Sequence, residues 1–158
     1  MRTVSLRAIA TEVDATTAYD RISDFVRYPE LTDTVISVEV DGADHQAVVS
    51  TWTVKFRRGL MRWTERDTFD PGAGTIDFIQ LSGDFASLRG MWRVTATEEG
   101  AEIEFTAEFD LGMPTLADIL DPVAESALRD NITVILGGLL GAVRLVAPAH
   151  PGDRAILN

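Results

Sequence analysis

The hydrophobic period of this chain changes once, near Gly112, and that change most strongly limits the folds open to it. From Val35 to Asp110, apolar and polar residues alternate in short segments that are separated by turns containing glycine. This alternation predicts half-buried strands joined by tight turns, and neighbouring strands joined in this way run antiparallel. Beyond Pro114 the pattern becomes helical, and Ile132–Val146 is apolar on nearly every side. A helix of that kind must be covered by other parts of the protein.

These patterns predict seven strands, which are Arg2–Thr11, Val35–Val40, Gln46–Phe56, Leu60–Phe69, Thr75–Leu81, Ser87–Thr97 and Glu102–Asp110. A first helix is predicted from the N-cap Asp14 to about Val26, with a short second helix at Tyr28–Leu31 and a long one at Leu116–Val146. An open antiparallel sheet must bury one face. We therefore expect an α+β fold, in which the sheet curls around the long C-terminal helix and encloses a cavity. One domain is expected over residues 1–147, with a C-terminal tail over 148–158.

Composition excludes several classes of function. The 158 residues include 14 Lys and Arg and 25 Asp and Glu, a net charge of −11, so binding to nucleic acid is not expected. With no cysteine and only two histidines, the chain is expected to hold no metal and no cofactor, and to be cytoplasmic. No phosphate loop, dinucleotide fingerprint or nucleophile elbow is present. The longest apolar run, Ile132–Val143, falls short of the roughly 20 residues of a membrane span.

The predicted strand Leu60–Phe69 has no simple core face. One face carries Arg62, Thr64, Arg66 and Thr68, and the other carries Met61, Trp63, Glu65, Asp67 and Phe69. From the residues alone, the arginines can point into the cavity or can pair with carboxylates outside it. Inward arginines would need a carboxylate or a ligand oxygen as partner, because burying an unpaired guanidinium is costly. If Met61, Trp63 and Phe69 point outward instead, they form an apolar stripe that suits a homodimer face.

Several segments together resemble one known family. They are Tyr28–Leu31, Trp63–Arg66, Phe85–Trp92, Glu108–Leu111 and Arg129–Asn131. With the order of elements, these segments resemble the START-like (SRPBCC), helix-grip superfamily, and within it the polyketide cyclase/dehydrase family. The resemblance runs from about Thr3 to Val146 and is greatest to single-domain aromatase/cyclases of aromatic polyketide pathways. It implies a helix-grip fold of the START or Bet v 1-like type.

The resemblance also implies a set of site residues. Arg66 is then the catalytic residue that orients or protonates a polyketide oxygen, and Thr64 supplies a second catalytic group, a pocket hydroxyl. This implication favours the arginine face of the strand as the inward one, which also brings Arg62 into the pocket. The candidate substrate-binding residues are Tyr28, Thr32, Arg62, Gln80, Phe85, Leu88, Trp92 and Asn131. The match is incomplete, because Val35 stands where the family has a proton-donating tyrosine and Ala107 where it has a pocket glutamine.

Two functions from different classes remain open on the sequence. The resemblance implies a cofactor-independent aromatase/cyclase, which directs aldol closure and dehydration of a poly-β-keto or related intermediate inside the pocket. The alternative is a non-catalytic carrier for an apolar ligand such as a quinone, a lipid or a polyketide. A cyclase would receive its substrate on an acyl carrier protein, which is typically acidic. We expect docking of that protein at the basic cluster Lys55, Arg57 and Arg58.

Overall fold

The structure, a computed structural model, describes residues 2–42, 46–56, 59–112 and 117–146. Its eight strands are β1 (Arg2–Ala10), β2 (Val35–Asp41), β3 (Ala47–Phe56), β4 (Gly59–Asp70), β5 (Thr75–Gly83), β6 (Ser87–Thr97), β7 (Gly100–Asp110) and β8 (Val143–Val146). They form one antiparallel sheet in the order β2-β3-β4-β5-β6-β7-β1-β8. The chain thus meanders from β2 to β7, and β1 and β8 complete the far edge. The predicted helix-grip fold is confirmed.

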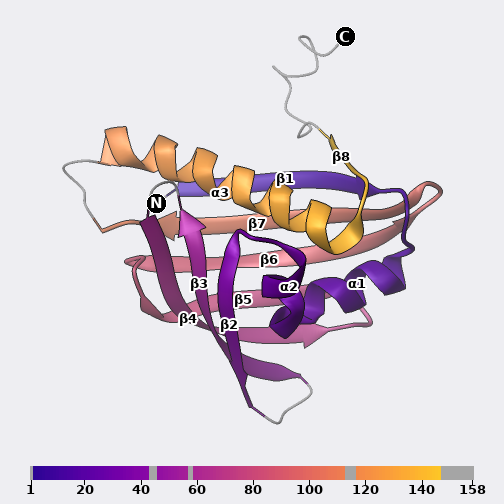
Figure 1. The fold of residues 1–158 in the computed structure, drawn as a ribbon, viewed down its shortest axis with the longest axis horizontal. Helices are drawn as coiled ribbons and strands as arrows, with labels where there is room; N and C mark the ends of the chain where they lie inside the picture. The colour runs from indigo at the N-terminus through magenta and orange to yellow at the C-terminus, as the bar shows by residue number, and fades with distance from the viewer. Residues whose placement is uncertain (1, 43–45, 57–58, 113–116, 147–158) are drawn as a thin grey trace.

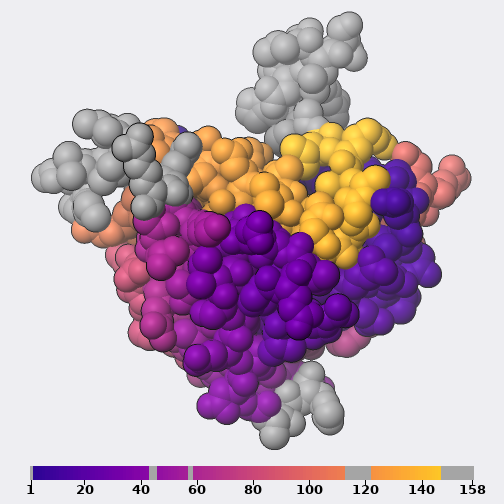
Figure 2. All heavy atoms as spheres, viewed as in Figure 1, coloured from indigo at the N-terminus to yellow at the C-terminus, as the bar shows by residue number. Residues whose placement is uncertain are grey.

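The helices lie on one side of this sheet. They are α1 (Ala15–Ser23), a 3₁₀ turn (Phe25–Arg27), α2 (Tyr28–Leu31) and α3 (Ala117–Leu140). Asp14 caps α1 as expected, since its Oδ1 accepts a hydrogen bond of 2.8 Å from the backbone N–H of Thr17. Figure 1 shows α3 running alongside β1, with α1 and α2 near its C-terminal end. In the space-filling view, atoms of α3 lie directly against the segment that carries α2 and β2 (Figure 2).

The end of α3 differs from the expected helix boundary. The helix stops at Leu140, and β8 then pairs with β1, which makes the sheet eight-stranded rather than seven-stranded. Gly141 has a φ of +79° and its N–H donates to the carbonyl oxygen of Gly137 at 3.1 Å. A glycine takes this left-handed conformation at little cost and so ends the helix. The segment that follows is then free to hydrogen-bond to the open edge of β1. The predicted tail at 148–158 lies outside the described residues.

Gly138 allows α3 to approach the end of α2 closely. A Cβ at Gly138 would lie 2.3 Å from the carbonyl oxygen of Leu31, whereas a Cβ at Gly137 would meet nothing within 4 Å. We therefore expect Gly138→Ala to lower the free energy of unfolding by about 1–3 kcal/mol, because α3 must shift away from α2. Gly137→Ala is expected to raise it by about 1 kcal/mol, through helix propensity alone. Urea unfolding of both variants checks this, and a change of the same sign in both would contradict the close approach.

The faces of β4 are the reverse of the expected ones. Arg62 and Arg66 are exposed on the outer side of the sheet, while Glu65 and Asp67 are buried. The prediction that the arginines line the cavity is therefore wrong. The reason is that a guanidinium keeps its charge at any accessible pH, whereas a carboxyl can take up a proton when it is buried. Burying the acids beside an inward Trp63 thus costs less than burying two arginines.

This reversal also moves the other predicted groups of the strand. Thr64 is half-buried on the outer side, where its hydroxyl forms a hydrogen bond of 2.9 Å with that of Thr51. Met61, Trp63 and Phe69 pack against the core instead of forming an outward stripe. These three residues therefore do not supply the outward stripe on which the possible homodimer face depended.

Candidate active site

A cavity of about 70 Å³ lies between the sheet and the helices. Its lining is aromatic and aliphatic apart from Glu65 and Asn131, and consists of Phe25, Tyr28, Trp52, Val54, Phe56, Trp63, Glu65, Phe78, Phe85, Leu88, Trp92, Phe105, Leu128, Asn131, Ile132 and Ile135. Pockets for organic ligands commonly enclose roughly 300–1,000 Å³. A ligand as large as a polyketide can therefore enter only when some of these side chains move apart.

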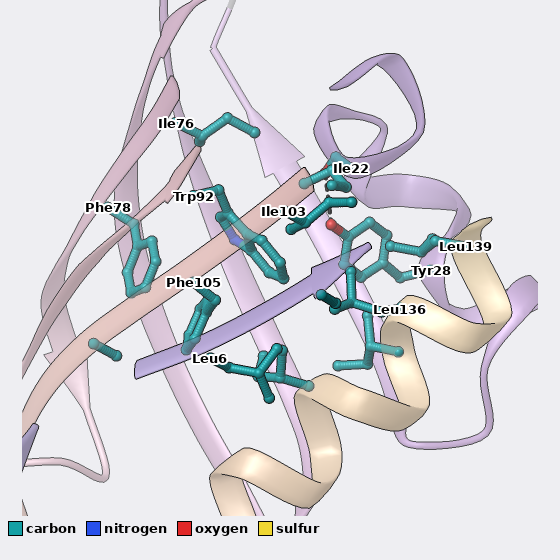
Figure 3. Close-up of a cluster of buried hydrophobic side chains, with 14 of the residues drawn as sticks. Leu6, Ile22, Tyr28, Ile76, Phe78, Trp92, Ile103, Phe105, Leu136 and Leu139 are labelled. Atoms are coloured by element: carbon teal, nitrogen blue, oxygen red, sulfur yellow. Dashed lines mark hydrogen bonds between the residues drawn. The ribbon is translucent and has the colours of Figure 1, made fainter. Parts of the chain in front are cut away.

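Flat aromatic rings form the cavity walls. The indoles of Trp52 and Trp63 stack in parallel, with 6.2 Å between centroids and 7° between planes. Phe25 and Tyr28 each meet Trp52 edge-on at 5.2 Å. On the other side of the core, Figure 3 shows Trp92 beside the ring of Phe105, and their centroids are 4.7 Å apart. Such surfaces suit planar, unsaturated ligands, which stack on rings or meet them at an edge.

Two carboxyl groups stand on consecutive inward positions of β4. The Glu65 side chain is 5% exposed and forms part of the cavity wall, while Asp67 is fully buried behind it. The indole N–H of Trp63 donates to Glu65 Oε1 at 2.6 Å, and the Glu65 and Asp67 side chains are hydrogen-bonded to each other. These contacts fix Glu65 against the cavity with one oxygen held by an indole.

The inner acid, Asp67, is held from β3. The Ser50 hydroxyl donates to Asp67 Oδ2, and Ser50 Oγ accepts the indole N–H of Trp52 at 2.8 Å. Asp67 Oδ1 is also buried, and no amide, ring or hydroxyl donor of the described residues reaches it. Its neighbour is the carboxyl group of Glu65, so the hydrogen bond between the two acids requires a proton on one of them.

Glu65 is the acid that carries this proton. Burial raises the pKa of Glu65 well above its ordinary value of 4.5, and the hydrogen bond with Asp67 and the charge of Asp67 raise it further. The Trp63 indole opposes these effects only in part. Burial also raises the pKa of Asp67, but the hydrogen bonds from Glu65 and Ser50 act in the opposite direction. Because the pKa of Glu65 is the more strongly raised of the two, Glu65 is the acid that holds the shared proton and donates it to Asp67, an arrangement suited to proton transfer.

Five of the predicted substrate-binding residues line the cavity, namely Tyr28, Phe85, Leu88, Trp92 and Asn131. The Tyr28 hydroxyl is not available to a ligand, because it donates to the carbonyl oxygen of Ile22 at 2.5 Å, and Figure 3 shows it turned toward Ile22. Burial raises the pKa of Tyr28 well above 10.0. Asn131 ties α3 to the end of β3, since its Nδ2 donates to the carbonyl oxygen of Lys55 at 2.6 Å. Both residues thus shape the cavity, while the Tyr28 hydroxyl and the Asn131 Nδ2 group make hydrogen bonds that hold the fold together.

The other predicted residues do not form part of this lining. Thr32 is buried, and its Oγ1 accepts from the backbone N–H of Thr34 at 3.3 Å. Gln80 donates to the carbonyl oxygen of Phe85 at 2.9 Å and so supports the segment that carries this wall residue. Arg62, Thr64 and Arg66 are on the outer side of the sheet, as described above. Of the predicted basic cluster, Lys55 is exposed, and Arg57 and Arg58 lie outside the described residues.

Sequence reasoning missed the acid pair and most of the aromatic wall. The lining residues that are not among the predicted substrate-binding residues are Phe25, Trp52, Val54, Phe56, Trp63, Glu65, Phe78, Phe105, Leu128, Ile132 and Ile135. One signal for the pair was available, because Glu65 and Asp67 alternate in phase with two aromatic residues, Trp63 and Phe69. Large aromatic side chains favour the buried face of a strand, and acids that alternate in phase with them lie on that same face.

Residues 11–134 match the sequence profile of a family described as polyketide cyclase / dehydrase and lipid transport. The chain belongs to this family. No curated protein sequence matches it. None of the helices among the described residues of this polyketide cyclase/dehydrase family member is long and apolar enough to cross a membrane.

Solved structures share the fold of this family member. A Thermus thermophilus protein has a TM-score of 0.80 and 21% identity, over 87% of this chain and 94% of its own. The Zhui aromatase/cyclase from a Streptomyces species has a TM-score of 0.77 and 17% identity, over 89% of this chain and 93% of its own. Norcoclaurine synthase from Thalictrum flavum has a TM-score of 0.58 and 14% identity, over 84% of this chain and 85% of its own. At these identities the likeness concerns the fold alone.

Proposed function

We propose that this protein is a cofactor-independent aromatase/cyclase, which directs the regiospecific aldol closure and dehydration of a poly-β-keto or related intermediate in its cavity. The observation that supports this proposal is a buried carboxylic acid, Glu65, whose pKa is raised and which lies in the wall of a cavity that is aromatic and aliphatic except for Glu65 and Asn131. Aldol closure needs a proton for the new alkoxide, and dehydration needs one for the departing hydroxyl group. A carrier for apolar ligands needs neither. Membership of the polyketide cyclase/dehydrase family supports the same reaction class.

The aromatic walls would supply most of the selectivity. A poly-β-ketone closes rings without a catalyst, so the protein has mainly to hold the chain in one folded shape. We expect the half-buried lining residues Phe56 and Leu128 to give way as the ligand enters, since they have less packing to lose than the fully buried ones. The stacked indoles of Trp52 and Trp63 would then lie against the forming ring.

Delivery of the substrate by an acyl carrier protein is part of the proposal. One observation supports this part of the proposal: Lys55 is exposed and its carbonyl oxygen accepts from Asn131 of α3, and Arg57 and Arg58 follow Lys55 closely in the sequence. An acidic carrier protein would overcome the net charge of −11 only through such a local basic patch.

The test is product analysis with a carrier-bound poly-β-ketone. With the protein present, we expect one ring regioisomer to exceed the others by at least about 10-fold, a difference of roughly 1.4 kcal/mol between competing barriers. The Arg57→Glu, Arg58→Glu double variant is expected to slow turnover of the carrier-bound chain, and the slowing should shrink as salt is added. A product mixture identical to that formed without protein would reject the cyclase function.

The carrier function is favoured by one observation, the near absence of polar groups in the cavity lining. Quinones and lipids need little more than an apolar cavity. This alternative predicts that such a ligand quenches tryptophan fluorescence in a saturable way. It also predicts that the ligand is recovered chemically unchanged after binding. The same experiment on a poly-β-ketone would then show binding without any change in the products.

A further inference from the structure

We infer that Glu65 is the catalytic residue that transfers protons to and from the bound ligand, and that Asp67 is a positioning residue that holds the second proton site of the pair. This inference rests on the proposed function and names the group that performs its chemistry. It follows from the placement of the two acids, because Glu65 forms part of the cavity wall and Asp67 does not. Asp67 can therefore act on a ligand only through Glu65.

The surroundings of the pair leave the shared proton free to move between the two acids. Tyr28, from α2, faces Glu65 as a neutral phenol whose proton is committed to a backbone carbonyl. From β3, the Ser50 hydroxyl donates to Asp67, and from β4 the Trp63 indole donates to Glu65. Among the described lining residues there is no Lys, Arg or His. No cation of the lining therefore fixes the negative charge on one acid, and both acids have a donor that stabilises their ionised form.

Glu65 and Asp67 together can hold and release the protons that ring closure and dehydration transfer. During closure, Glu65 donates its proton to the attacked carbonyl oxygen as the carbon–carbon bond forms, and the enol hydroxyl of the attacking unit returns a proton to Glu65. During dehydration, the proton of Glu65 first passes to Asp67, and Glu65 takes the proton from the carbon next to the ketone. The electron pair of that C–H bond forms the double bond. The departing hydroxide takes a proton from Glu65 and leaves as water, so the pair again holds one proton.

Proton transfer can be measured apart from ring closure. We would follow exchange of the α-protons of β-tetralone, a compact aromatic ketone, in D₂O with wild-type protein. Glu65→Gln is expected to lower the protein-dependent rate of α-proton exchange at least 100-fold, in keeping with the usual contribution of one general acid–base group. This variant keeps the fold, because the glutamine oxygen can accept from Trp63 and its amide can donate to Asp67. Glu104→Gln, a half-buried residue of β7 that does not line the cavity, is the matched control and should exchange at the wild-type rate.

The role of Asp67 has a separate readout. In Asp67→Asn, the side-chain oxygen can still accept from Ser50, and the amide then donates to Glu65. This donor favours the ionised form of Glu65, so the pH profile of exchange should move to lower pH, which a purely structural loss would not produce. Exchange that is undiminished in Glu65→Gln, or absent from the wild type, would overturn the inference. Exchange that depends on Glu65 without any change in ring products would instead uphold it and reject the proposed cyclisation alone.

Discussion

Replacing Trp52 by alanine is expected to lower the free energy of unfolding by about 3–5 kcal/mol, as large aromatic truncations in cores do. The indole is 7% exposed and contacts the rings of Phe25, Tyr28 and Trp63. Its N–H also donates to Ser50. Removing it would leave a cavity next to the existing one and would remove a common contact of β4, the 3₁₀ turn and α2. Urea unfolding followed by circular dichroism measures the loss.

Trp52→Phe separates packing from hydrogen bonding. Phenylalanine keeps a ring in the cluster but cannot donate to Ser50, so we expect a smaller loss, with about 1 kcal/mol of it from the missing hydrogen bond. Equal losses in the alanine and phenylalanine variants would show that the hydrogen bond, and not the ring packing, dominates at this position.

Raising the pH is expected to destabilise the folded protein. The pKa of Glu65 is raised in the folded state, so above the ordinary value of 4.5 the unfolded chain releases a proton that the folded protein retains. The stabilisation is complete below that ordinary value and is lost as the pH rises toward the folded-state pKa. In this window the free energy of unfolding should fall by roughly 1.4 kcal/mol for each pH unit per retained proton. Urea unfolding at a series of pH values gives the slope.

Glu65→Gln is the control for this slope. Its neutral amide mimics the protonated acid and does not titrate, so the contribution of Glu65 to the slope should vanish while the effect of other groups remains. At high pH the variant should exceed the wild type in stability. A slope that is the same in both proteins would mean that Glu65 is ionised in the folded state, in conflict with its burial beside Asp67.

The order and type of the elements follow from local signals in this sequence. Strands alternate with a period of two, and glycine-containing turns such as Glu98–Gly100 connect them. Asp14 caps a helix because its side chain bonds within the first turn, which depends on neighbours in the chain only. Even the cavity was foreseeable, since one apolar helix must be covered by one curled sheet. Of the predicted binding residues, the wall positions Phe85, Leu88 and Trp92 have the expected apolar character and lie in the cavity wall.

Only the tertiary structure decided which face of β4 is buried. Both faces carry charged residues, and a shift of one position exchanges them completely, so alternation alone does not distinguish the two. The register with β3 places Trp63 opposite Trp52 and Glu65 opposite Ser50, which sets the acids inside and the arginines outside. The same holds for the edge of the sheet, where Val143–Val146 became a strand because β1 offered a free edge to it. The chemistry of the site thus depends on contacts between strands, and these are long-range properties that no single segment specifies.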